Sequence, residues 1–205
     1  MGRVPAGGPA SPLRHPWAGV RSARGIVTRA AVLLALAGST AATGMGPEVT
    51  VESHAGAFDV RGSFKTHAPL SVAWDVLTDY GHIASFVSSM HESRIEQRND
   101  DTLRVHQVAS ISVLLFHRNA TVTLAVIETP PHRIEFVDVL GQDFRSYAGS
   151  WSLQPDSGAT KVSYVLEAAP RTGPSGWLSR GVMSRTTSDL LAQVRREIER
   201  RAAQR

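Results

Sequence analysis

Hydrophobic residues between positions 70 and 80 recur three or four apart, the spacing of one helix face. They are Leu70, Ala73, Trp74, Leu77 and Tyr80. Pro69 suits the first helical position, because the N–H that proline lacks would have no partner there. The pattern predicts a helix of about three turns. Asp79 lies where a carboxylate opposes the dipole of this helix, so we expect it to cap a second short helix through Ile83 and Phe86.

Strand patterns stand on both sides of these helices. Residues 49–65 are expected to be extended, with Gly56 and Gly62 as bulges or a break. After the helices come six runs of alternating or β-branched residues, separated by turn residues. They begin near residues 94, 103, 121, 134, 144 and 162. In the run from Ile134 either face fits the inward side, because Asp138 interrupts one of them. Six strands in hairpin succession predict an antiparallel meander.

The last segment returns to the helical period. Its apolar stripe consists of Met183, Thr187, Leu190, Leu191, Val194 and Ile198. This spacing predicts a helix of about 25 residues docked on the strands. The outer face of its final turns is expected to carry Arg195, Arg196, Glu197, Arg200 and Arg201. Such mixed charge is typical of a solvated face, which we favour over a membrane-binding one.

The first 43 residues have the pattern of an export signal. Five arginines precede a short apolar run, residues 30–37, and small residues follow up to Ala42. A basic region, a short apolar region and a small-residue site describe a secretory signal peptide. A membrane anchor is the alternative, but the run is far shorter than the roughly 20 residues that span a bilayer. We therefore predict a leader at 1–43, an extension at 44–56 and a domain at 57–202.

This leader accounts for the positive charge of the chain. It holds five of the 22 basic residues and none of the 18 acidic ones, so the remainder has a formal net charge of −1 instead of +4. The charge therefore does not indicate nucleic-acid binding. The absence of cysteine excludes disulfides and thiol catalysis. Arginine outnumbers lysine by 20 to two, as in GC-rich bacterial genomes. We expect a bacterial periplasmic or envelope protein without a transmembrane segment, in at most transient contact with membranes.

The predicted order of elements is a helix-grip arrangement, an α+β fold in which a curved antiparallel sheet wraps a long C-terminal helix. Two short helices follow its first strand. Over about residues 57–202 the sequence resembles the START-like (SRPBCC) superfamily, specifically its polyketide cyclase/dehydrase and coenzyme-Q-binding branch. The motifs that carry this resemblance are Ala68-Pro69, residues 74–80 with Phe86, 128–134, 149–153 and 158–164.

The resemblance implies an apolar cavity between sheet and helix, for ligands such as lipids, quinones, sterols or aromatic polyketides. Binding or carriage of a hydrophobic small molecule is the function we expect. A cyclase or dehydratase acting on a hydrophobic carbonyl compound is the alternative. A second alternative is a protein-interaction module that works through the C-terminal helix. No cofactor is implied.

Nine residues are candidates to line this cavity: Trp74, Phe86, His106, Tyr147, Trp151, Tyr164, Met183, Leu190 and Val194. Tyr147 and Trp151 share one strand face at positions i and i+4, and Tyr164 extends the same aromatic wall. A packed core explains this aromatic set more simply than a specific ligand contact does.

Polar residues on or beside predicted strands are His106, His117, Arg118 and Arg145. Facing inward, they would orient a carbonyl or act as acid and base, whereas facing outward they would only be solvated. Trp177 follows a Pro/Gly-rich segment, residues 170–176, that is either a gate hinge or a plain loop.

No catalytic motif is visible in the sequence. The eight histidines show no metal-ligand spacing, and no Gly-rich phosphate loop or nucleophile elbow occurs. Asp75 and Asp79 are spaced i and i+4 on a helix, where solubility and capping explain them better than paired acid/base chemistry. The sequence therefore predicts neither a metal site nor a catalytic constellation.

Overall fold

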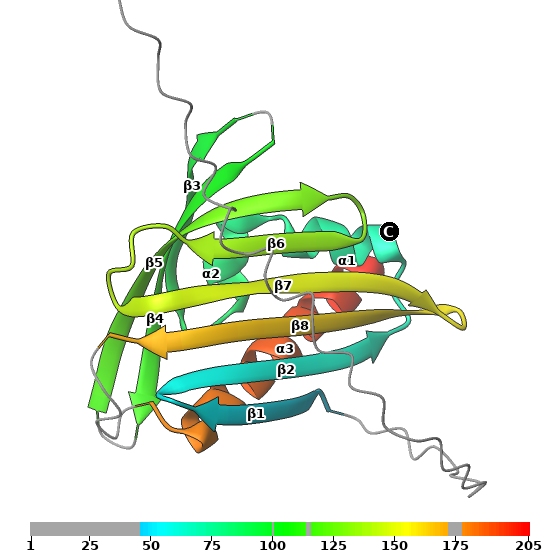
Figure 1. Cartoon of the computed structure of the whole chain (residues 1–205). Helices are drawn as coiled ribbons and strands as arrows, with labels where there is room; N and C mark the ends of the chain where they lie inside the picture. The colour runs from blue at the N-terminus through cyan, green and yellow to red at the C-terminus, as the bar shows by residue number, and fades with distance from the viewer. Residues whose placement is uncertain (1–45, 100, 114–115, 172–177) are drawn as a thin grey trace, which may run out of the picture. The chain divides into compact units, whose positions relative to one another are not determined.

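The computed structural model describes residues 46–99, 101–113, 116–171 and 178–205, which form one antiparallel sheet and a few helices (Figure 1). The strands are β1 (Glu48–His54), β2 (Ala57–Thr66), β3 (Met90–Arg98), β4 (Leu103–Val113), β5 (Phe116–Thr129), β6 (Arg133–Asp138), β7 (Phe144–Asp156) and β8 (Ala159–Pro170). The helices are α1 (Leu70–Leu77), the 3-10 helix η2 (Tyr80–His82), α2 (Ile83–Phe86) and α3 (Arg180–Ala202). The predicted leader and Trp177 lie outside the described residues.

The sheet has the strand order β1-β2-β8-β7-β6-β5-β4-β3. The six strands from β3 to β8 form the predicted meander, and all neighbouring pairs are antiparallel. The sheet curves, and α3 runs along one of its faces (Figure 1). The predicted α+β helix-grip fold is confirmed.

The segment predicted to be extended from 49 to 65 is a hairpin of two strands. Ala55 and Gly56 have φ values of 47° and 78°, as in the two-residue turns that join antiparallel strands. Gly56 is therefore the break that the sequence suggested. The residues that we assigned to an N-terminal extension supply the edge strand β1, which pairs with β2 along its length.

Gly62 neither bulges nor breaks β2; instead it lets α3 approach the sheet. A Cβ at this position would lie 2.5 Å from Cδ1 of Leu191, closer than real Cβ atoms come to other atoms. Leu191 is fully buried and belongs to the main hydrophobic cluster. Close packing of β2 against α3 therefore depends on the missing side chain at residue 62.

The short helices after β2 differ in detail from the prediction. Helix α1 has eight residues, fewer than expected, and Pro69 is its N-cap instead of its first helical residue. Asp79 occupies the N-cap of η2, but its side chain makes no capping hydrogen bond. Its carboxylate instead accepts from His82 Nδ1 at 2.6 Å and from Arg201 Nη2 at 2.8 Å.

The apolar stripe of α3 is confirmed, with Met183, Leu191, Val194 and Ile198 all buried. Ser179 caps the helix by accepting a hydrogen bond from Val182 N. The predicted charged outer face is wrong at Glu197, which is only 8% exposed.

Glu197 and Arg201 connect α3 to the short helices. The Glu197 carboxylate accepts hydrogen bonds from Arg200 and Arg201, which lower its pKa to about 2 against the opposing effect of burial. Arg201 also binds Asp79, and Arg205 Nη2 lies 2.6 Å from Asp75 Oδ2. These contacts between residues more than 120 positions apart hold the end of α3 against α1 and η2.

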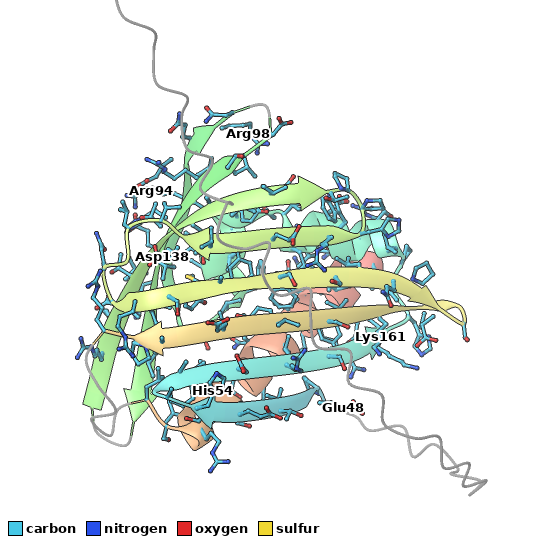
Figure 2. All side chains as sticks on the ribbon, viewed as in Figure 1. Glu48, His54, Arg94, Arg98, Asp138 and Lys161 are labelled. Carbon is cyan, nitrogen blue, oxygen red and sulfur yellow. The ribbon has the colours of Figure 1, made fainter. Side chains whose placement is uncertain are left out.

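The core lies between the concave face of the sheet and the helices, whereas the other face is polar. Figure 2 labels Arg94, Asp138 and Lys161 among the polar side chains away from α3. Within residues 46–205, apart from the undescribed positions, no helix combines the length and apolar character needed to cross a bilayer.

Gly62→Ala should destabilise the protein by about 1–3 kcal/mol, because the new methyl group would displace the buried Leu191 side chain. Gly81→Ala is the matched control, since a Cβ there meets no atom within 4 Å. Urea unfolding followed by circular dichroism measures both. Equal stability of the two variants would contradict the close approach of β2 and α3.

Glu197→Gln should cost about 2 kcal/mol at pH 7, because Arg200 and Arg201 lose a buried charged acceptor. The folded-state pKa of Glu197 is depressed, so its contribution is present above the unfolded-state pKa and is lost as pH falls from about 4.5 towards 2. The free energy of unfolding, measured at several pH values, should thus differ less between Glu197→Gln and wild type as the pH falls.

Glu199→Gln is the control for this series, because Glu199 pairs with Arg195 at 42% side-chain exposure. Exposed pairs contribute little, so we expect a change below about 0.5 kcal/mol at every pH. If Glu197→Gln lost the same stability at every pH, its effect would be steric instead of electrostatic.

Candidate functional site

Two adjoining pockets lie between the sheet and the helices, with volumes of about 120 and 130 Å³. The first is bordered by α1, η2, α2, the strands β3–β8 and the middle of α3. The second is bordered by β3, β4, β5, β7, β8 and the N-terminal half of α3. Six residues line both pockets: Val87, Met90, Gln107, Tyr147, Tyr164 and Leu190. We call these six residues the junction.

Aromatic side chains from the central strands form one wall of the first pocket. The Trp151 and Tyr164 ring centroids are 4.5 Å apart, and the ring centroid of Phe136 lies 6.0 Å from that of Tyr147 and 6.3 Å from that of Tyr164. Phe144 adds a contact with Tyr147 at 4.9 Å. Such tilted and stacked pairs fix ring positions. The predicted aromatic set is therefore packed together and also borders open space.

The pockets are apolar and carry no formal charge. Their described lining contains no Asp, Glu, His, Lys or Arg. The polar side-chain groups among this lining are seven hydroxyls, the amide of Gln107 and the indole N–H of Trp151. A lining of this kind favours neutral ligands, because a charged group would lose its hydration without gaining a partner.

Tyr147 and Tyr164 share a side-chain hydrogen bond inside this apolar space. Burial raises the pKa of both phenols. Their hydrogen bond raises the pKa of Tyr164 further and lowers that of Tyr147. Tyr147 retains some accessible surface although protein atoms surround it, because the pockets reach it.

Tyr80 closes the first pocket near α1. Its hydroxyl donates to Glu128 Oε1 at 2.8 Å. Burial and the negative charge of Glu128 raise the pKa of Tyr80 strongly. Its hydroxyl hydrogen is therefore already used.

A short connection holds the loop after α2 against α3. The amide of Ser88 donates to Gln193 Oε1 at 2.8 Å, and the Arg201 guanidinium lies 5.9 Å from the centre of the Phe86 ring. Phe86 and Leu190 are only partly buried and line the first pocket. Side chains thus close the line of contact between α2, with the loop after it, and α3. We call this contact the seam.

Of the nine predicted site residues, seven line a pocket: Phe86, Tyr147, Trp151, Tyr164, Met183, Leu190 and Val194. Trp74 does not; it packs against the hydrophobic core. His106 does not line a pocket either, because Gln107 is the residue of β4 that faces inward there. The His106 ring lies beside Thr123 and Glu96, on the opposite face of the sheet.

The other polar candidates do not converge on the pockets. Arg118 forms an exposed ion pair with Asp143, and Arg145 is exposed on β7. The side chain of His117 lies outside the described residues. The pairing of His106 with Arg145 or Tyr147 that a cyclase would use is therefore not present in the described cavity. Among the described positions, no group of three or more metal-binding side chains occurs.

Gln107 is the functional candidate that sequence reasoning missed. Its Nε2 donates to Ser93 Oγ at 3.2 Å, which holds the amide at the junction. The signal was present: Gln107 is the one polar position in the alternating series Leu103, Val105, Gln107, Ala109 and Ile111. A polar residue in phase with inward apolar residues merits attention as a ligand contact.

Residues 66–195 match the family model described as polyketide cyclase/dehydrase and lipid transport. The chain belongs to this family. The match covers α1 to most of α3 and includes all the described lining of the two pockets. A comparison with curated proteins gave no match.

Solved structures similar to this polyketide cyclase/dehydrase family member share its fold. A STAR-related lipid transfer protein from Xanthomonas axonopodis is 18% identical, with a TM-score of 0.62, over 76% of this chain and 94% of that one. The Zhui aromatase/cyclase from Streptomyces sp. R1128 is 18% identical, with a TM-score of 0.59, over 71% and 95%. The protein TTHA0849 from Thermus thermophilus has 18% identity and a TM-score of 0.61, over 70% and 99%.

All three tyrosines of this family member should resist ionisation in the folded state, since the pKa of each is raised. A raised folded-state pKa contributes stability that is complete below the unfolded pKa of about 10 and is lost as pH rises above it. Absorbance at 295 nm should therefore show tyrosinate only together with loss of circular dichroism. Gradual titration near pH 10 in a folded protein would contradict the burial of these phenols.

Proposed function

We propose that this protein binds and carries a small, neutral, hydrophobic molecule in the two pockets between the sheet and α3. The observation that carries the proposal is an internal space bordered by aliphatic and aromatic side chains without a charged group among its described lining. The family description, which names lipid transport, and the STAR-related neighbour support the same function.

The size of the pockets narrows the ligand class. Each pocket of about 120–130 Å³ resembles the cavity of roughly 150 Å³ that holds one benzene molecule in an engineered protein. Both are smaller than typical drug-sized sites of about 300–1,000 Å³. Ring-sized groups therefore fit this conformation, whereas a long acyl chain requires a wider opening. Among lipid-, quinone- and polyketide-like ligands, this favours the compact aromatic ones.

The place of action that we propose is the bacterial periplasm or envelope. The support is the sequence pattern of residues 1–43, with arginines, a short apolar run and small residues in that order. A carrier there would move a poorly soluble compound through an aqueous space.

Bromobenzene titration followed by tryptophan fluorescence tests the binding proposal, because a bound bromine quenches nearby indoles. Trp151 lines the first pocket, so we expect saturable quenching with a Kd on the order of 10–100 μM. Trp151→Phe should remove most of the quenching. Trp74→Phe, the control, should retain it because Trp74 packs in the core instead of lining a pocket.

Quenching that is linear in bromobenzene, or equal in both variants, would contradict a binding pocket. Mass spectrometry of an organic extract of the protein purified from its native host would identify the natural ligand. Intact mass of the same material would decide whether residues 1 to about 42 have been removed.

A further inference from the structure

The junction between the two pockets is more polar than the space on either side of it. Of its six residues, Gln107, Tyr147 and Tyr164 carry polar side chains. They come from three strands, β4, β7 and β8. A ligand that fills both pockets must therefore pass an amide and two phenol groups at its middle.

The two phenols of the junction have hydrogen-bonding capacity to spare. A hydrogen bond between two hydroxyl groups uses only one of their two hydrogens, whichever group donates. Tyr147 is partly exposed whereas Tyr164 is only 4% exposed, so Tyr147 is the phenol that a ligand can reach. A buried donor without a partner costs free energy that an acceptor on a ligand would restore. Tyr147 also lines both pockets, so a ligand that fills them lies against it.

Shape and charge limit what that ligand can be. Each pocket accommodates about one ring, and neither offers a cationic partner for a carboxylate or phosphate among its described lining. Phe136, Trp151 and Phe144 supply flat apolar surfaces on the two sides of the junction. The acceptor must then be an uncharged oxygen located between two apolar groups.

We infer that the cavity is built for a diaryl-ketone-like ligand, with two ring-sized apolar parts on either side of one neutral oxygen that accepts from the Tyr147 hydroxyl. This inference rests on the proposed function and adds a ligand class and a specificity-determining residue to it. Tyr164 is the positioning residue, because its hydrogen bond fixes the orientation of the Tyr147 hydroxyl.

Benzophenone and diphenylmethane form a matched probe pair that differs only in the central oxygen. Their dissociation constants are to be measured by calorimetry with the wild-type chain and with Tyr147→Phe. Loss of one neutral hydrogen bond should shift the ratio of the two constants roughly 2- to 10-fold in favour of diphenylmethane. The double variant with Tyr164→Phe prevents the second phenol from replacing the first and should show at least the same shift.

Tyr80→Phe is the control, because it removes a phenol that lines the first pocket but already donates to Glu128. Its ratio should equal that of wild type. Circular dichroism and the tryptophan emission maximum confirm that each variant is folded.

The outcomes separate the two proposals. Binding of both probes with an unchanged ratio in Tyr147→Phe and in the double variant would overturn the ketone-like ligand and leave the binding function intact. Equal shifts in Tyr147→Phe and Tyr80→Phe would also overturn it, because the effect would then not be specific to the junction. Failure of both probes to bind the wild-type chain would overturn the proposed function as well.

Discussion

The close packing of α3 against β1 and β2 is the constraint on which the rest of the structure depends. Gly62 lets the Leu191 side chain reach the backbone of β2, so the helix lies against this edge of the sheet. Between the helix and the strands from β4 to β7 the space is only partly filled, because the two pockets lie there. The cavity arises because α3 touches β1 and β2 but stays apart from the strands further along the sheet. An ordinary side chain at residue 62 would change both the contact with β2 and the size of the cavity.

Alternation and turn chemistry were enough to predict most of the fold, because the local rules agree with the global arrangement. The meander from β3 to β8 follows from period-two runs, and the stripe of α3 follows from period 3.6. Glu197 was misplaced because its partner Arg201 also binds Asp79, more than 120 residues away. No local pattern reveals a pairing over that distance, and a glutamate among arginines resembles an exposed residue.

The candidate site was predictable where residue size alone decides its position. Aromatic residues on inward strand positions reached the cavity wall, as expected. His106 did not, since a shift of one residue moves a strand side chain to the opposite face of the sheet. Gln107, its neighbour, carries an amide in the inward phase, in step with Leu103, Val105 and Ala109. The alternation along β4 therefore indicated which of the two adjacent polar residues enters the cavity, but a lone polar residue among apolar ones was not read as a ligand contact.

The two sides of the cavity are held by different forces, and this decides how it can adapt. On the sheet side, the wall is fixed by the backbone hydrogen bonds of paired strands. On the helix side, it is fixed by side chains, such as the contact of Ser88 with Gln193. Enlarging the space at this seam therefore breaks no strand pairing. A change in cavity size at this seam would therefore leave the fold of the sheet unchanged.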